Sequence, residues 1–288
     1  MRKNVAGIWF ESKTSPDEHV MRLFELGNGH REVVITRPTV WQELDPKMAE
    51  MFGDTWAEAD ERERERTKKF REEQNRKRAA RRAKTRVRRM VKVMGLDALL
   101  TLTYQANQTD QALCKRHMKE FIRRMRRLIP GFQYVAAFET QKRGAWHVHL
   151  ATHALPRELP AANGVKVKSF NIVRAVWRSV VGELGGNIDQ QRRKRSSRQS
   201  SSKLAAYLSK YMLKAFEDGD DWSNRYSASS GVEVPEGVML RFKDAAMADL
   251  IGLAFDEAAP GHCEVTTWLS RWGDTFYMST EGWRPCVH

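Results

Sequence analysis

The sequence is poor in cysteine, with three residues in 288, and none of them lies in a Cys-x-x-Cys pair. Such widely spaced cysteines exclude a disulfide framework, so a reducing compartment is expected. No run approaches the roughly 18 apolar residues of a membrane span. The apolar stretch 5–10 ends at Glu11, too short for a signal peptide. A Gly-Lys-Ser/Thr phosphate loop is also absent, so no ATP site of that type is expected. These absences predict a cytoplasmic protein without membrane association.

Basic residues, by contrast, are abundant and unevenly placed. The chain has 50 Lys and Arg against 36 Asp and Glu, a net charge of +14, which favours a nucleic-acid partner. Residues 58–92 alone hold 16 Lys and Arg against 7 acids, and residues 74–96 hold no acid. No Pro or Gly interrupts this segment before Gly95, so a long exposed helix is expected. It is either a solvated linker or an arm that follows phosphates.

Two groups of cations are candidates for nucleic-acid contacts. One lies on the predicted helix, and the other lies in a serine-rich stretch that is expected to be a basic loop. The candidates are Arg76, Arg78, Arg81, Arg82, Arg86, Arg88 and Arg89 in the helix, and Arg192, Arg193, Lys194 and Arg195 in the loop.

The periodicity of residues 97–245 predicts an α+β domain with an antiparallel sheet. Strands are expected at 99–104, 132–140, 145–152 and 187–189, and helices after Asp110 and from Ser169. This β-α-β-β-α-β order is that of the ferredoxin-like or split βαβ arrangement, and one more helix follows at 203–216. Around this domain the sequence predicts a β-rich N-terminal module of unknown role (1–57), the basic helix (58–96) and a Trp-rich C-terminal extension (246–288), whose tryptophans are expected to pack.

The predicted hairpin of 132–152 places two histidines and a glutamate together. His147 and His149 point to the same face, because successive strand residues alternate. If residues 142–144 form a three-residue turn with Gly144 left-handed, Gln141 pairs with Ala145 and Glu139 lies opposite His147. The three side chains would then form a divalent metal site with open positions. His153 has the same parity and is the alternative third ligand.

The predicted helix 203–216 carries a second constellation. Tyr207 and Tyr211 are four residues apart and therefore neighbours on a helix surface. Each is followed three residues later by a lysine, Lys210 or Lys214. Ammonium groups favour the phenolate form of tyrosine, and a metal polarises a phosphate, so the combination suits attack on a phosphodiester. Packing of the tyrosines with solvated lysines is the structural alternative.

Together these motifs resemble the HUH endonucleases, and among them the two-tyrosine replication initiators of rolling-circle plasmids and small single-stranded DNA phages. The resemblance covers about half of the chain. It rests on 100–103 (Leu-Thr-Leu-Thr), on Glu139 with 147–149 (His-Val-His), and on 207–211 (Tyr-Leu-Ser-Lys-Tyr).

The resemblance implies site-specific nicking and joining of single-stranded or hairpin origin DNA through a 5′-phosphotyrosine. Glu139, His147 and His149 would hold Mg²⁺ or Mn²⁺. Tyr207 would attack first and Tyr211 second, and Lys210 and Lys214 would position the phosphate or lower the tyrosine pKa. A host helicase and polymerase would be partners, and a bacterial plasmid or phage would encode the chain.

Other functions stay open at this point. The same chemistry would serve a two-tyrosine transposase or a relaxase, although relaxases usually carry their tyrosine near the N-terminus. A non-catalytic nucleic-acid binder on a ferredoxin-like sheet is the alternative from another class. RNA-recognition sheets present aromatic residues on their central strands, where this sequence has histidines and a glutamate.

Overall fold

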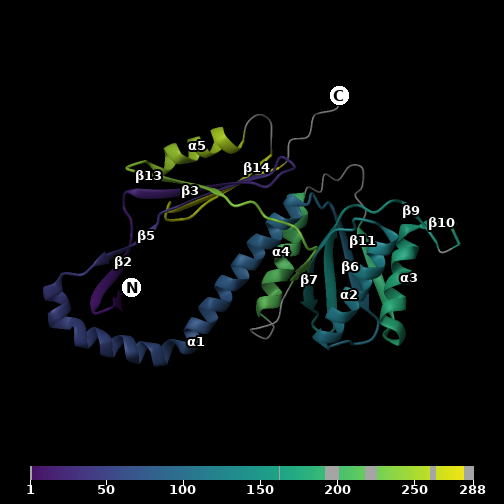
Figure 1. Cartoon of the computed structure of the whole chain (residues 1–288), viewed down its shortest axis with the longest axis horizontal. Coiled ribbons are helices and arrows are strands. Elements are labelled where there is room, and N and C mark those ends of the chain that lie inside the picture. The colour runs from purple at the N-terminus through teal and green to yellow at the C-terminus, as the bar shows by residue number, and fades with distance from the viewer. Residues whose placement is uncertain (1, 162, 192–200, 218–225, 260–263, 282–288) are drawn as a thin grey trace. The chain divides into compact units, whose positions relative to one another are not determined.

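The computed structural model describes residues 2–161, 163–191, 201–217, 226–259 and 264–281 (Figure 1). The chain divides into two compact units, one made of residues 1–75 and 235–288 and the other of residues 76–234. Helix α1 (Pro46–Val93) contributes residues to both units. The second unit contains every candidate metal ligand and candidate nucleophile predicted from the sequence.

The second unit alternates strands and helices in the predicted order. Its main elements are β6 (Ala98–Tyr104), α2 (Gln111–Leu128), β7 (Tyr134–Thr140), β8 (Trp146–Thr152), α3 (Ser169–Val181), β11 (Gly186–Gln191) and α4 (Ser201–Glu217). Two short strands, β9 (Glu158–Pro160) and β10 (Lys166–Lys168), pair before α3, and a 3-10 turn (Gly182–Leu184) precedes β11. The predicted β-α-β-β-α-β order and the helix after it are confirmed.

These strands form one antiparallel sheet in the order β11-β6-β8-β7-β12, where β12 (Tyr226–Ala228) is a short edge strand. Strand β8 lies between β6 and β7 and is antiparallel to both. Helix α2 therefore connects two strands that a third strand separates, which is the split βαβ connection. The predicted α+β class with an antiparallel sheet is confirmed.

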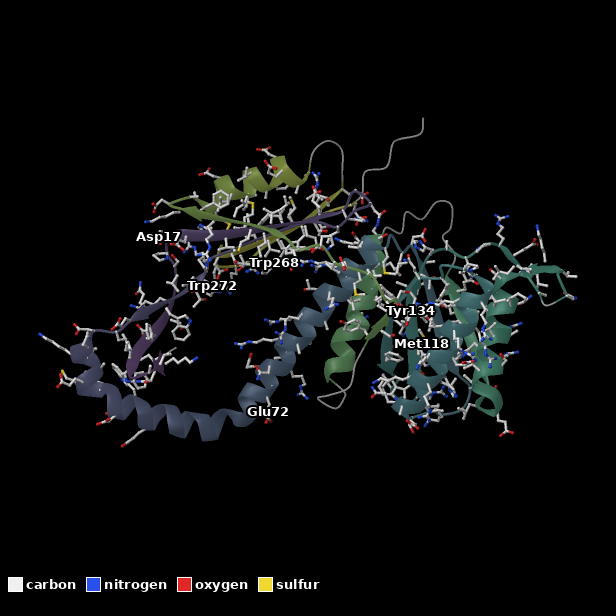
Figure 2. All side chains as sticks on the ribbon, viewed as in Figure 1. Asp17, Glu72, Met118, Tyr134, Trp268 and Trp272 are labelled. Atoms are coloured by element: carbon white, nitrogen blue, oxygen red, sulfur yellow. The ribbon has the colours of Figure 1, made fainter. Side chains whose placement is uncertain are left out.

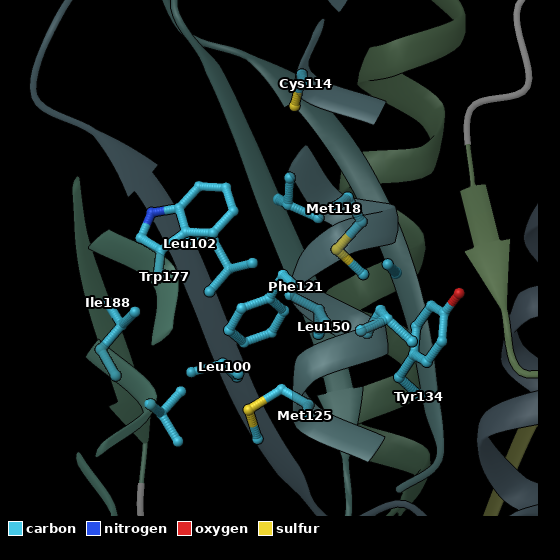
Figure 3. Packing of buried hydrophobic residues seen from close by; sticks show 14 of the residues in the cluster. Leu100, Leu102, Cys114, Met118, Phe121, Met125, Tyr134, Leu150, Trp177 and Ile188 are labelled. Atoms are coloured by element: carbon cyan, nitrogen blue, oxygen red, sulfur yellow. The ribbon is translucent and has the colours of Figure 1, made fainter. Parts of the chain in front are cut away.

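Helices cover both faces of this sheet. On one face, Leu100 and Leu102 pack with Phe121 of α2 and Trp177 of α3 (Figure 3). Leu99 points the other way and packs with the end of α1 and with α4. The buried residues of this second cluster are Val87, Met90, Val91, Met94, Leu96, Leu99, Val135, Ala137, Ala151, Leu204, Ala205 and Leu208. Burial on both faces explains why the central strands are almost continuously apolar.

Helix α1 is longer than predicted and only partly exposed. It begins at Pro46, a residue whose fixed φ suits the first helical position, and it ends at Val93. Near its end, Val87 and Val91 are buried, and so is Lys92. The expectation of a helix exposed along its whole length is therefore wrong, because its last turns bury apolar side chains against the sheet. Although α1 has 48 residues, no helix within the described ranges is apolar enough over a sufficient length to cross a membrane.

The first unit combines strands from both ends of the chain. The strands are β1 (Arg2–Val5), β2 (Ile8–Thr14), β3 (Glu18–Glu25), β4 (Arg31–Thr36), β5 (Thr39–Glu43), β13 (Val238–Lys243), β14 (Val265–Leu269) and β15 (Thr275–Thr280). They form a three-stranded sheet, β1-β2-β5, and a five-stranded sheet, β13-β3-β4-β15-β14. Helix α5 (Met247–Ala258) packs Leu250 and Ala254 against Val33 and Ile35 of the larger sheet. The N-terminal module is β-rich as expected, and it shares a sheet with the C-terminal segment.

The tryptophans of the C-terminal segment are not core residues. Trp268 and Trp272 are 56% and 83% exposed, and Figure 2 labels both. The expectation that they pack is therefore wrong for these two residues. Trp283 lies outside the described residues.

Candidate metal and nucleophile site

The hairpin between β7 and β8 has the predicted turn and register. The amide of Gln141 donates to the carbonyl of Ala145 at 2.9 Å, and the amide of Gly144 donates to the carbonyl of Gln141 at 2.8 Å. Gly144 has a φ of 86°, the left-handed conformation that favours glycine at this position. Glu139 lies opposite His147, as the constant-sum pairing predicted. A one-residue slip would have separated these two side chains onto opposite faces.

The closest contact at the site joins Glu139 to His149, the diagonal neighbour rather than the directly opposed residue. Oε2 of Glu139 and Nε2 of His149 are 2.8 Å apart, and the two side chains are only 12% and 7% exposed. On the other side of the ring, Nδ1 of His149 lies 3.2 Å from Oγ1 of Thr101 in β6. Both nitrogens of this imidazole therefore have a partner, and the ring orientation is held from two strands.

His147 shares the face but has a different partner. The side-chain amide of Gln141 donates to its Nδ1 at 3.1 Å, and the ring centroids of His147 and His149 are 6.4 Å apart. A neutral ring that accepts at Nδ1 carries its proton on Nε2. Metal binding through Nε2 of His147 would therefore require the other tautomer, with the Gln141 amide turned to offer its oxygen.

The three predicted ligands are thus on one face, but they do not all converge. Among the described residues, no three His, Cys, Asp or Glu side chains are grouped so that they could hold a metal ion. Two imidazoles and a carboxylate nevertheless supply nitrogen and oxygen donors of the kind that divalent cations accept. The metal assignment stays a prediction that needs a rotation of His147.

His153, the alternative third ligand, lies away from this site. It follows the end of β8, is exposed, and its Nε2 lies 3.3 Å from Oε1 of Gln133. Six residues separate it from His147, which corresponds to about 20 Å along an extended chain. The parity argument for His153 was correct, but the distance along the strand removes it from the group.

Helix α4, which carries the candidate nucleophiles, packs on the same face as Glu139 and His149. Leu204 and Leu208 of α4 are buried in the cluster that contains Ala137, the residue opposite His149. Tyr207 is 40% exposed, and Lys203 and Lys210 on the same side of the helix are also exposed. The side chains of Tyr211 and Lys214 lie outside the described residues, although α4 includes both positions. The sheet therefore does not separate the histidines from the tyrosine helix.

A thiol does not compete for the role of nucleophile among the described residues. Cys114 of α2 is fully buried in the core, and burial raises its pKa to about 11. A thiol that stays protonated and is closed to solvent is a poor nucleophile. A hydroxyl is thus the better candidate.

Two residues at the site were not singled out from the sequence. Thr101 lies inside the 100–103 motif, but its contact with His149 depends on the pairing of β6 with β8, which spacing alone does not give. Gln141 was detectable, because it has the same strand parity as Glu139 and therefore belongs to the face of His147.

The candidate nucleic-acid contacts on α1 are mostly at the surface. Arg76, Arg78, Arg81, Arg82 and Arg86 are exposed, whereas Arg88 and Arg89 are half-buried. Arg192, Arg193, Lys194 and Arg195 lie outside the described residues. The role of all these residues stays a prediction.

Replacing Arg78, Arg81, Arg82 and Arg86 together with Gln should weaken binding of single-stranded DNA and flatten its salt dependence. If all four contact phosphates, the slope of log K against log salt falls by about 2.8, which is four times the value of about 0.7 per contact. Fluorescence anisotropy over a salt series measures this slope. A Lys166→Gln, Lys168→Gln chain, altered in β10, is the control. Equal slopes for the wild type and the fourfold variant would make this part of α1 a linker.

Comparison with known proteins identifies one family. Residues 97–216 match the family model of the replication-associated protein ORF2. The matched segment runs from the residue before β6 to the last turn of α4 and includes Glu139, His149 and Tyr207. No curated protein and no solved structure matches the chain. The family match supports a replication-associated protein, with the role of a replication initiator.

Proposed function

We propose that this chain initiates replication by nicking and rejoining single-stranded origin DNA through a covalent tyrosine ester, with a divalent metal as cofactor. The observation that carries the proposal is the Glu139–His149 pair on the face that α4 covers, within the segment that matches the replication-associated family. The family match also favours replication over transposition or conjugative transfer. A catalytic role is favoured over simple binding because a buried carboxylate–imidazole pair is not a surface for stacking bases.

Each residue has a defined task in this mechanism. The oxygen of Tyr207 forms a bond to phosphorus as the phenol loses its proton. The bond from phosphorus to the 3′ oxygen breaks, and that oxygen leaves as a hydroxyl after taking up a proton. Lys210 lies one turn from Tyr207, where its ammonium group favours the phenolate and attracts the DNA phosphate. Tyr211 would accept the strand in a second, equivalent transfer.

Glu139, His147 and His149 would hold the cation. A divalent ion bound there supplies charge stabilisation to the phosphate oxygens as negative charge develops. Thr101 acts through His149: once Nε2 serves as a ligand, Nδ1 carries the proton and donates it to the Thr101 hydroxyl. The face is enclosed by α4 and the end of α1, which limits access of water to the ester.

The proposal is tested by incubating the protein with single-stranded origin oligonucleotides and Mn²⁺. We expect a conjugate of protein and DNA that survives denaturation, together with a free 3′-hydroxyl fragment, and we expect EDTA to prevent both. Mass spectrometry of the conjugate should locate the DNA on the α4 peptide. Binding of the oligonucleotide without any conjugate would instead support a non-catalytic nucleic-acid binder.

A further inference from the structure

Helix α2 carries a second cationic surface that lies outside the motifs. It has seven Lys and Arg residues and one acid, Glu120, so its net charge is +6 (7 − 1) over 18 residues. Glu120 pairs with Arg123 and Arg124, at 2.6 Å and 2.7 Å. Hydrogen bonds from these two guanidinium groups lower the pKa of Glu120 to about 2, so it stays ionised. The excess of positive charge on the helix is therefore present at every pH near neutrality.

Five of these cations line one pocket of about 680 Å³ between α2 and the β7–β12 edge of the sheet. They are Lys115, Lys119, Arg123, Arg126 and Arg127. The volume is within the usual range of about 300–1,000 Å³ for ligand sites. Arg116 and Arg124 of the same helix do not line it. The pocket thus collects most of the charge of α2 on one side.

The rest of the pocket wall is apolar with a polar corner. Met118 and Ile122 of α2 and Phe138 of β7 contribute the apolar part. The hydroxyl of Tyr134 lies 3.0 Å from Oγ of Ser227 in β12. Figure 3 shows the Tyr134 ring at the border of the buried cluster, with its oxygen turned away from that cluster. Cations beside an apolar wall suit a ligand that has both phosphates and flat bases.

This pocket and the candidate nicking site lie on opposite faces of the same strand. Phe138 belongs to the cluster under α2, whereas the next residue, Glu139, points to the face under α4. Strand β7 has only the short strand β12 between it and the edge of the sheet. A flexible single strand can follow this edge from one face to the other, but a rigid duplex cannot.

We propose that the α2 pocket binds single-stranded DNA that flanks the segment held at the candidate nicking site, which rests on the proposed function. Phosphates would lie on the lysines and arginines, and a base would lie against the apolar wall. The spacing favours a polynucleotide over a free nucleotide. Lys115 and Arg127 are 12 residues apart, or about 18 Å along the helix, a distance that several successive phosphates span and one nucleotide does not.

The test compares two variants that each lose two positive charges. Lys119→Gln with Arg126→Gln alters the pocket, and Arg116→Gln with Arg174→Gln alters α2 and α3 outside it. The probe is an oligothymidylate of about 30 nucleotides in EDTA, which is longer than the roughly 4–16 nucleotides of a single small site. We expect the pocket variant to bind about 25-fold more weakly at 0.1 M salt, because two lost contacts lower the salt slope by about 1.4. The control variant should bind like the wild type.

Further measurements decide the outcome. A 5-iodouracil oligonucleotide should cross-link to Tyr134, and thymidine monophosphate should not compete with it. A Lys119→Arg, Arg126→Lys chain, which keeps both charges, should restore binding if the pocket variant has lost charge rather than fold. Equal affinities of the two charge-loss variants would overturn the proposal, as would cross-linking confined to other elements or efficient competition by the mononucleotide.

Because the assay contains no metal and needs no nicking, its result separates from that of the proposed function. Equal affinities together with a normal covalent conjugate would remove the pocket and leave the nicking site. Weaker binding by the pocket variant together with no conjugate from the wild type would remove the nicking site and leave a single-strand binding surface.

Discussion

Replacing Tyr207 with Phe, alone or together with Tyr211→Phe, should eliminate the covalent conjugate with single-stranded DNA. The substitution removes only the hydroxyl that would form the phosphoester, and no other described residue on α4 offers an equivalent phenol. Loss of a nucleophile in enzymes with covalent intermediates lowers rates by several orders of magnitude, so we expect a fall of at least about 100-fold in conjugate yield. Denaturing electrophoresis with labelled DNA and Mn²⁺ measures this yield.

Tyr277→Phe in β15 is the matched control, since it removes the same atom from a different unit. It should form the conjugate as the wild type does. If Tyr207→Phe forms conjugate normally but the double variant forms none, Tyr211 is the first nucleophile. Undiminished conjugate in the double variant would contradict the assignment of α4 altogether.

The local geometry of the site was predictable because it depends on short-range rules. The left-handed Gly144 fixes the turn, the turn fixes the register, and the register places Glu139 opposite His147. The exposed stripe with Tyr207 and the buried residues Leu204 and Leu208 follow from helical periodicity in the same way. In each case the separation in sequence is small, so few alternative pairings compete.

Long-range pairing was not predictable by these rules. Val33 of β4 pairs with Met278 of β15, and no local pattern in either strand names the other. The contact of Thr101 with His149 likewise depends on which strands become neighbours. The length of α1 was also misjudged, because its charge pattern suggested exposure while Val87 and Val91 bury against a distant sheet. On α2, the apolar periodicity was used for the core and its cations were passed over.

Replacing His149 with Gln should abolish cation-dependent nicking and weaken Mn²⁺ binding at least about 10- to 100-fold. A glutamine amide can still donate a hydrogen bond to the buried Glu139, which avoids the cost of about 1–3 kcal/mol for an unpartnered group, but it is a poor metal ligand. Glu139→Gln should have a similar effect because it removes the negative charge of the site. Calorimetry with Mn²⁺ in the absence of DNA measures binding separately from activity.

His153→Gln is the matched control, because it changes a histidine of the same parity just beyond the same strand while leaving the Glu139 pair intact. It should bind Mn²⁺ and nick DNA like the wild type, and both should stop nicking in EDTA. Thermal unfolding of all three variants separates loss of metal from loss of fold. If His149→Gln and Glu139→Gln both keep EDTA-sensitive nicking, the cation is held elsewhere; if nicking persists in EDTA, the carboxylate–imidazole pair serves proton transfer or structure instead.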